Sequence, residues 1–228
     1  MNIAVILAAG KSRRMRKNDK IFCQIKGKPL IFYTISAFQK NYQINKIILV
    51  ARKKFFKRFS SLTQKYGFNK VAAVVEGGKE RQDSSFNGLK MAKNLGAKLN
   101  DLILFHNGAN PLISQEEINA VIKEAKKHKA ALIGQPAKDT VKEINKNGFL
   151  ARTIDRQKIF LAQTPQAIEY KLAEKAFKKA LKEKFKGTDD VSLVERMGKK
   201  VKAVPGSFKN IKATYSEDLR IIEALLEE

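Results

Sequence analysis

Short apolar runs alternate with segments of helical spacing along most of this chain. Strand patterns at 3–7, 46–51, 70–75, 102–106 and 130–135 alternate with helix patterns at 30–40, 54–66, 82–95 and 115–128. Further on, helix patterns at 171–182 and 190–197 precede a strand at 201–205 and a closing helix after Ser216. Strands that are apolar on both faces are typical of parallel sheets covered by helices on each side. The pattern predicts an α/β fold with a doubly wound, mostly parallel sheet, which binds ligands at the carboxyl ends of its strands.

One segment, 137–166, interrupts this alternation. Strand-like stretches at 140–144 and 149–154 flank Asn145-Lys146-Asn147-Gly148, and an Asn-Gly pair is a strong hairpin signal. The segment is too short to be a domain, so we predict a single domain over 1–228 that carries a β-arm. The residues alone leave two interpretations open: an ordinary surface hairpin, or an arm that reaches a partner subunit.

The first strand leads into Leu7-Ala8-Ala9-Gly10, with Arg14 and Lys20 following. Small residues let the backbone N–H groups approach a ligand, and nearby cations suit a polyphosphate. A Walker A loop would need a glycine at Val5, and a dinucleotide fingerprint would need glycines at Ser12 and Met15, so neither fits. The stretch predicts a phosphate-binding loop of another kind; a plain turn with scattered basic residues is the alternative.

Composition restricts the function classes. The 46 basic residues exceed the 22 acidic ones and give a net charge of +24, which raises nucleic acid as a partner. Only 10 of the 46 are arginine and no nucleic-acid-binding motif is present, so we expect solvated lysine faces and no specific nucleic acid. No apolar run reaches membrane-spanning length, and no signal peptide is expected. The single Cys23 cannot form an internal disulfide, which favours a reducing, cytoplasmic location.

Two further stretches carry polar groups directly after predicted strands. Gly77-Gly78-Lys79-Glu80-Arg81-Gln82-Asp83-Ser84 places two glycines and a hydroxyl where a flat base edge would fit, although a glycine turn with a polar helix cap is the alternative. His106-Asn107-Gly108-Ala109-Asn110-Pro111 ends the strand at 102–106, and His106 is more consistent with a structural than a catalytic role.

Together these motifs resemble those of the sugar-phosphate nucleotidylyltransferases, in particular the 2-C-methyl-D-erythritol 4-phosphate cytidylyltransferase family. The resemblance includes Leu-Ala-Ala-Gly-x-x-x-Arg-Met followed by a lysine, and Gly-Gly-x-Glu-Arg-x-Asp-Ser. It continues through Asp139-Thr140, Thr153-Ile154-Asp155-Arg156, Gln163-Thr164-Pro165-Gln166 and Asn210-Ile211-Lys212-Ala213-Thr214. Each motif is weak by itself, whereas the whole set in the correct order is a strong signal.

The resemblance implies a Rossmann-like nucleotidyltransferase fold with a protruding β-hairpin arm. It also implies transfer of the cytidylyl group of CTP to 2-C-methyl-D-erythritol 4-phosphate in isoprenoid precursor synthesis, with ribitol 5-phosphate as an alternative acceptor. A basic nucleic-acid-binding protein is the alternative of another class. The resemblance assigns catalytic roles to Arg14, Lys20, Arg156 and Lys212. It assigns substrate binding to Leu7, Ala8, Ala9, Gly10, Gly78, Lys79, Arg81, Ser84, Gly108, Asp139, Thr140 and Thr164.

The resemblance further implies a homodimer in which the arm, with Thr140 and Arg156, covers the nucleotide of the neighbouring subunit. Magnesium is the expected cofactor, yet Asn107 stands where the family has a metal-binding aspartate, and Asn110 replaces an arginine. In the first loop, Ser12 replaces a glycine and Asp19 a proline. Mg²⁺ prefers charged oxygen ligands, so we expect it to bind through the triphosphate with Asn107 as a weak ligand.

Overall fold

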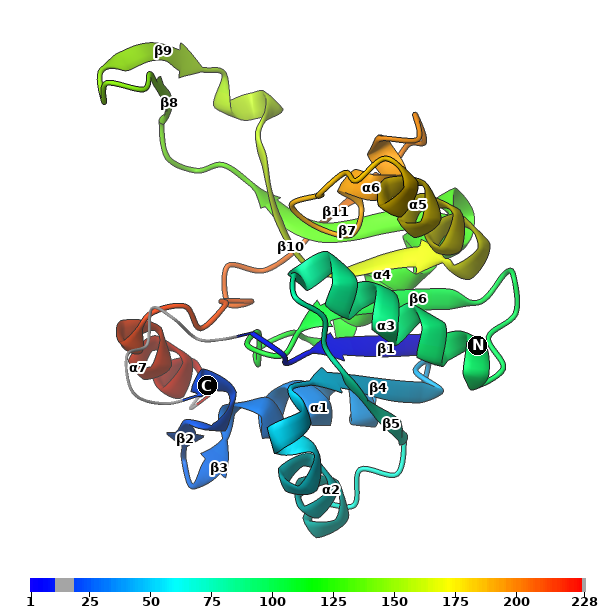
Figure 1. Ribbon diagram of the computed structural model, residues 1–228. Coiled ribbons are helices and arrows are strands. Elements are labelled where there is room, and N and C mark those ends of the chain that lie inside the picture. Colours follow the sequence, from blue (N-terminus) through cyan, green and yellow to red (C-terminus); the bar gives the residue numbers. More distant parts are fainter. Residues whose placement is uncertain (11–18, 227–228) are drawn as a thin grey trace.

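The computed structural model describes residues 1–10 and 19–226 and has a seven-stranded sheet at its centre (Figure 1). In spatial order the strands are β11 (Lys202–Pro205), β7 (Ala130–Pro136), β10 (Phe160–Glu169), β6 (Leu102–Asn107), β1 (Asn2–Leu7), β4 (Lys46–Ala51) and β5 (Val71–Glu76). Adjacent strands are parallel except at β10, which runs antiparallel to both neighbours. The predicted α/β fold with a mostly parallel sheet is confirmed.

Helices cover both faces of this sheet. One core contains residues from α1 (Leu30–Lys40), α2 (Phe56–Lys65) and α4 (Gln115–His128). The core on the other face contains residues from α3 (Arg81–Asn94), α5 (Tyr170–Lys182) and the short α6 (Ser192–Glu195). Residues 3–6 of β1 are fully buried because both of its faces carry a helical layer. None of the described helices is both long and apolar enough to cross a membrane.

Local signals account for the ends of several helices. The predicted capping box of α4 is present: the Glu117 N–H donates to Ser114 Oγ (3.2 Å), and the Ser114 N–H donates to Glu117 Oε2 (3.0 Å). At the other end Lys129 adopts a left-handed conformation with φ of 69°, which stops the helix directly before β7. Here the sequence pattern and the structure agree to the residue.

Strand β10 differs from the prediction, because it was not expected and it lies in the middle of the sheet. Its sequence mixes apolar residues with Gln163, Thr164 and Gln166, and its register with β7 is interrupted between Ala162 and Gln166. Pro165 lies in the interrupted stretch, where it need not donate to a neighbouring strand. The predicted arm of 137–166 is therefore too long: residues 160–166 belong to the central sheet, and 137–159 leave it.

The arm consists of β8 (Val141–Ile144), β9 (Leu150–Ile154) and the 3-10 turn η3 (Arg156–Lys158). Its two strands pair antiparallel, as predicted, and they project from the body at the end where the parallel strands finish (Figure 1). Three large apolar side chains on it are exposed: Ile144 (64%), Phe149 (70%) and Leu150 (67%). A folded monomer gains nothing from apolar side chains held in water.

A small subassembly lies at the same end of the sheet. It comprises the 3-10 turns η1 (Lys20–Phe22) and η2 (Lys53–Phe55), the hairpin of β2 (Gln24–Ile25) and β3 (Lys28–Pro29), and α7 (Ser216–Leu225). The hairpin turn uses positive φ angles at Lys26 (47°) and Gly27 (72°). Ile25, Leu30, Ala109, Ala213 and Ile222 form a third apolar core, which attaches the C-terminal helix to β2 and the start of α1.

Candidate active site

Three loops meet at the carboxyl ends of β1, β5 and β6. The Gly108 N–H donates to the Leu7 carbonyl oxygen (2.9 Å), and the Ala8 N–H donates to the Val50 carbonyl oxygen (2.7 Å). A Cβ atom on Gly77 would lie 2.3 Å from the Ala9 Cβ, so only glycine allows the loop after β5 to approach the loop after β1 this closely. The sequence-predicted residues Leu7, Ala8, Ala9 and Gly108 therefore lie together.

The loop after β5 is held by the first turn of α3. The Gly78 N–H donates to Ser84 Oγ (3.0 Å), and the Ser84 hydroxyl donates to the Glu80 carbonyl oxygen (3.1 Å). A Cβ atom on Gly78 would lie 2.1 Å from the Asp83 Cβ. Ser84 is buried, whereas Lys79 at the tip of the loop is exposed. The structure thus joins Gly78 and Ser84, two of the residues predicted to contact a base.

Lys20 and the Lys212 segment meet beside these loops, although 193 positions separate the groups that touch. Lys20 Nζ donates to the Ala213 carbonyl oxygen (2.7 Å), and the Ala213 N–H donates to the Ala109 carbonyl oxygen (2.8 Å). Lys20 is therefore brought to the backbone of the segment that carries Lys212, next to the glycine loop after β6. Arg14, the third predicted cation of this group, lies outside the described residues.

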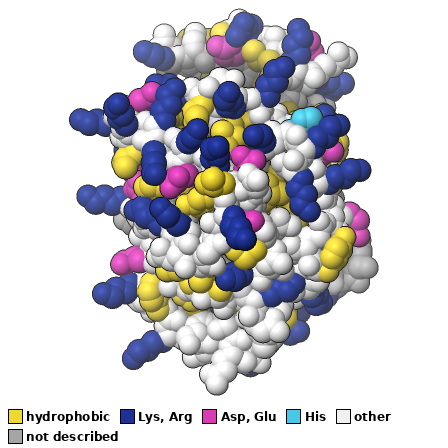
Figure 2. Space-filling model, turned by 90° about the vertical axis from the view of Figure 1, so that its right-hand side faces the viewer, with side chains coloured by type: hydrophobic (Ala, Val, Ile, Leu, Met, Phe, Trp, Pro, Cys, Tyr) yellow, Lys and Arg dark blue, Asp and Glu magenta, His cyan; other side chains and the backbone are white. Residues whose placement is uncertain are grey.

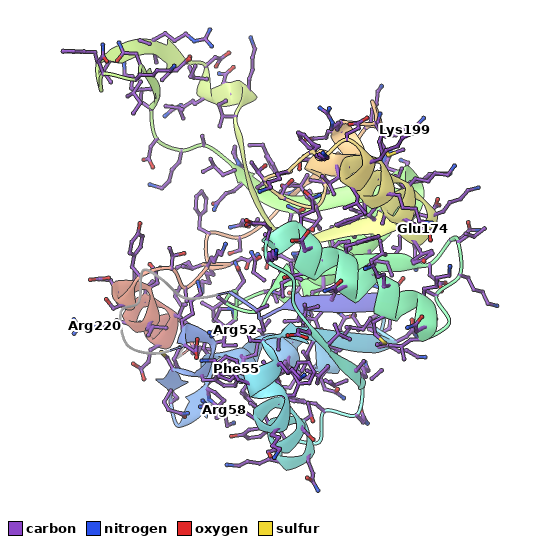
Figure 3. All side chains as sticks on the ribbon, viewed as in Figure 1. Arg52, Phe55, Arg58, Glu174, Lys199 and Arg220 are labelled. Carbon is purple, nitrogen blue, oxygen red and sulfur yellow. The ribbon has the colours of Figure 1, made fainter. Side chains whose placement is uncertain are left out.

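Asp19 is held by a cluster that sequence reasoning did not identify. Its carboxylate forms an ion pair with Arg52, and its Oδ2 lies 3.5 Å from Lys54 Nζ. Arg52 lies over the Phe55 ring, and Figure 3 shows Arg52, Phe55 and Arg58 grouped together near η2 and the start of α2. The ion pairs of Asp19 thus fix the backbone directly before Lys20. The available signal was the unusual aspartate in front of the lysine, but its partner is 33 residues away.

A cleft of about 590 Å³ opens next to these loops. Four sequence-predicted residues line it: Arg81, Asn107, Thr164 and Lys212. Arg81 donates to Asp190 Oδ2 (2.6 Å); burial lowers the pKa of Arg81, but the Asp190 carboxylate outweighs this and leaves that pKa raised. Arg81 thus stays protonated in the wall of the cleft, where its charge is paired with the buried Asp190 carboxylate.

Amide side chains connect the walls of this cleft. Asn107 Nδ2 donates to Asn110 Oδ1 (3.2 Å), and Asn110 Nδ2 donates to Asn210 Oδ1 (3.2 Å). Asn210 Nδ2 in turn donates to the Thr164 carbonyl oxygen (2.9 Å), while the Asn107 N–H donates to Thr164 Oγ1 (3.2 Å). The segment that carries Lys212 is thereby tied to β6 and β10. The structural role of Asn210 and Asn110 was missed, because nothing in the sequence pairs residues 100 positions apart.

His106 supports this network from below. Its Nε2 lies 3.0 Å from the Asn110 carbonyl oxygen, its ring packs against Phe38, and the residue is fully buried. Burial lowers the pKa of His106 to about 4, so the ring is neutral at pH 7 and its Nε2–H donates to the carbonyl. These contacts support the structural interpretation of His106.

Within one chain, the arm residues lie apart from this site. Arg156 donates to the Lys138 carbonyl oxygen (2.7 Å) at the base of the arm, and Asp139, Thr140 and Arg156 are all exposed. In Figures 1 and 3 the arm and its side chains extend away from the glycine loops and α7. The structure therefore does not bring these three predicted residues to Lys20 and Lys212 of the same chain.

Basic side chains are dispersed over the surface (Figure 2), and acidic side chains form no metal-binding cluster among the described residues. Lysine and arginine side chains are spread over the whole face shown in Figure 2 and are not gathered into one stripe. No group of three or more His, Cys, Asp or Glu side chains among residues 1–10 and 19–226 is arranged to hold a metal ion. Asn107 is the predicted metal ligand, and it offers a neutral oxygen.

Comparison with known proteins matches the whole chain. The family model of 2-C-methyl-D-erythritol 4-phosphate cytidylyltransferase matches residues 2–228. Relatives with that name include one from Caldanaerobacter subterraneus, 43% identical with 99% of each chain covered. Another, from Clostridium acetobutylicum, is 41% identical, with 100% of this chain and 98% of the relative covered. The crystal structure of 4-diphosphocytidyl-2C-methyl-D-erythritol synthase from Anaerococcus prevotii superimposes with a TM-score of 0.84 at 32% identity, covering 100% of this chain and 98% of that one.

Proposed function

This chain belongs to the 2-C-methyl-D-erythritol 4-phosphate cytidylyltransferase family, and on that premise we propose that it joins CTP to 2-C-methyl-D-erythritol 4-phosphate at the cleft beside β6. The products are CDP-methylerythritol, used in isoprenoid precursor synthesis, and pyrophosphate. The observation that carries the proposal is the meeting of Lys20 with the Lys212 segment at the glycine loops. It provides two cations and backbone N–H groups at the strand ends where an α/β sheet binds its ligand.

The reaction needs charge neutralisation more than proton transfer. An anionic phosphate oxygen of the acceptor attacks the α-phosphorus of CTP, and the bond from that phosphorus to the oxygen of the β-phosphate breaks. Because the nucleophile already carries negative charge, positioning and electrostatic stabilisation supply most of the catalysis. We assign Lys20 and Arg14 to the triphosphate and Lys212 to the point where the two substrates' phosphates meet.

The base of CTP is assigned to the loop after β5. Gly78 is held by Ser84, and its lack of a side chain leaves backbone groups accessible to a planar base. Lys79 lies at the rim of this loop. We assign Leu7 to Gly10 to the stretch between the base and the phosphates, and the close approach of Gly77 to Ala9 supports this assignment.

Magnesium is proposed to bind mainly through the triphosphate. The Asn107 amide donates its Nδ2 hydrogen to Asn110, so its Oδ1 is the group left for a cation, and a neutral oxygen is a weaker ligand than a carboxylate. When bound, the metal supplies positive charge to the phosphates. Asn107 is the residue in the described part of the cleft that we assign to it.

A homodimer is proposed because large apolar side chains of the arm are exposed to solvent in a single chain. Its exposed Ile144, Phe149 and Leu150 would be buried against a second copy, and Thr140 and Arg156 would then lie over the neighbour's site. A two-fold axis would make this exchange reciprocal. The predicted cytoplasmic location fits the family's small-molecule substrates and stays a prediction.

One assay tests the reaction and the acceptor together. Pyrophosphate release is measured with CTP, UTP, ATP or GTP, each combined with methylerythritol phosphate or ribitol 5-phosphate. We expect turnover with CTP and methylerythritol phosphate, as the family match supports. Faster turnover with ribitol 5-phosphate would reassign the acceptor, and no turnover with any pair would contradict the proposed function.

A further inference from the structure

We propose that a one-way series of hydrogen bonds through three asparagines, of which Asn110 and Asn210 are buried, fixes the Asn107 side chain so that it presents its oxygen to the substrate cleft. The series runs from Asn107 through Asn110 to Asn210, with each Nδ2 donating to the next acceptor. This inference rests on the proposed function, because it concerns what the cleft binds. It makes Asn110 and Asn210 positioning residues that act through Asn107.

Two backbone carbonyl groups determine the donor-to-acceptor direction of this hydrogen-bond series. An amide side chain can often be turned by 180° without loss, because its oxygen and nitrogen have similar shapes. Here Asn210 Nδ2 meets the Thr164 carbonyl oxygen (2.9 Å), and Asn110 Nδ2 meets both the Asn210 carbonyl oxygen (3.3 Å) and Asn210 Oδ1. A carbonyl oxygen only accepts, so turning either amide would place oxygen against oxygen.

Because these groups are buried, water cannot supply the hydrogen bonds that an amide rotated by 180° would lose. Asn110 is 2% exposed, Asn210 is 1% exposed and Thr164 is 4% exposed. The backbone of Asn110 is fixed as well, because its carbonyl accepts from the buried His106 ring (3.0 Å). With Asn110 Oδ1 held as an acceptor, Asn107 must direct Nδ2 toward it, and Oδ1 remains for the cleft.

The orientation defines the class of group that Asn107 contacts. A carbonyl oxygen attracts a cation or a hydrogen-bond donor, and it repels a phosphate oxygen. The occupant beside Asn107 is therefore electropositive: a divalent cation carried by the triphosphate, or a hydroxyl group of the ribose or the acceptor. One Nδ2 hydrogen of Asn107 is taken by Asn110, so the side chain cannot offer both of its N–H groups to a phosphate.

The orientation of the three side-chain amides is measured first in the unmodified protein. Side-chain amide protons are observed by NMR after ¹⁵N-asparagine labelling, with signals assigned by substitution. We expect the Asn107, Asn110 and Asn210 NH₂ groups each to show one proton protected from solvent exchange. Rapid exchange of both Asn107 amide protons would overturn the proposal, whatever the catalytic rate of the protein.

Substitution then tests the consequence for binding. Asn110→Leu removes the acceptor that orients Asn107, and we expect binding of magnesium and CTP together to weaken roughly 10- to 100-fold, as for partners that orient a ligand group. Asn41→Leu is the matched control, because Asn41 is also buried (1% exposed) and bonded to two amide side chains, Gln115 and Asn119, near the other end of the sheet. Equal losses in the two variants, measured by calorimetry, would overturn the proposal.

Asn107→Asp identifies the electropositive group. If it is a cation, the carboxylate lowers the magnesium concentration for half-maximal CTP binding and weakens binding of CTP without metal. If it is a hydroxyl, the magnesium requirement stays unchanged, and Asn107→Leu abolishes the preference for CTP over 2′-deoxy-CTP, or the dependence on an acceptor hydroxyl. Either pattern supports the proposal, whereas an unchanged profile in both variants contradicts it. Failure of the unmodified protein to release pyrophosphate would contradict the proposed function only.

Discussion

The cleft beside β6 and the β8–β9 arm both carry predicted substrate-binding residues, yet they are built in opposite ways. Around the cleft, polar groups such as Asn110, Asn210 and Thr164 are buried and bonded to one another. On the arm, the polar residues Thr140 and Arg156 and the large apolar side chains are exposed. The described cleft residues make these contacts within one chain, whereas the arm residues are exposed. If the proposed homodimer forms, nucleotide binding is preorganised in each chain and acceptor binding depends on assembly.

The largest expected effect is on the cleft side of the comparison. Lys20→Ala and Lys212→Ala should each lower kcat/KM on the order of a hundredfold to a thousandfold, because each removes a positive charge that we propose stabilises the phosphate being transferred. Steady-state pyrophosphate release measures this, with melting curves to verify folding. Lys199→Ala, which removes an exposed lysine at the α5–α6 end of the molecule (Figure 3), is the control and should retain full activity.

The next experiment asks whether cleft and arm of one active site come from different chains. Lys20→Ala and Arg156→Ala proteins, each nearly inactive, are unfolded, mixed in equal amounts and refolded. In a mixed dimer one site has both lesions and the other has neither, so activity should recover to roughly a quarter of the unmodified value. No recovery, in a mixture shown to contain mixed dimers, would mean that each arm serves its own chain.

A third experiment separates assembly from folding. Replacing the exposed Phe149 and Leu150 by serine should shift the protein from dimer to monomer in sedimentation, because it removes apolar area proposed to be buried between copies. The monomer should remain folded, since exposed side chains contribute only about 0.5 kcal/mol or less to stability. Tyr42→Ser, at a still more exposed site (81%) away from the arm, should leave the dimer intact.

The smallest expected effect is a dependence of the free energy of unfolding on pH, through the buried His106 of β6. The pKa of His106 is about 4 when folded against 6.5 for an ordinary histidine, so the unfolded chain binds more protons between these values. Stability is therefore full above pH 6.5 and falls as pH decreases toward 4, by about 2 kcal/mol at pH 5. Denaturant unfolding should show a shallower fall in His106→Gln, whereas His128→Gln should follow the unmodified protein. An identical pH dependence in His106→Gln would contradict this role.

The parallel strands were predictable because their physical cause is local. A strand covered on both faces must be apolar at nearly every position, and 3–7, 46–51 and 102–106 show this directly. Strand β10 escaped prediction because Gln163 and Thr164 interrupt its apolar pattern. Gln163 donates to carbonyl oxygens of the 207–210 segment, so its polarity reflects neighbours distant in sequence.

The same distinction separates predictable from unpredictable features of the site. Glycine loops after strands can be seen in the sequence, and they were assigned correctly to one edge of the sheet. The ion pair of Asp19 with Arg52 and the bonds of Asn110 to Asn210 join residues far apart in the chain. No local pattern marks such pairs, because either residue alone resembles an ordinary surface side chain. They require the coordinates of the folded chain.

The bond from Lys20 to the Ala213 carbonyl oxygen has a consequence for the order in which the protein is made. A ribosome synthesises all seven strands of the sheet before it reaches residues 207–214, so the nascent chain is able to form its hydrophobic layers while Lys20 still lacks this acceptor. Contacts across such a long sequence separation are slow to form. Completion of the active site would then be a late event in biogenesis, and a chain truncated at residue 206 would contain all seven strands but lack the carbonyl group that accepts from Lys20.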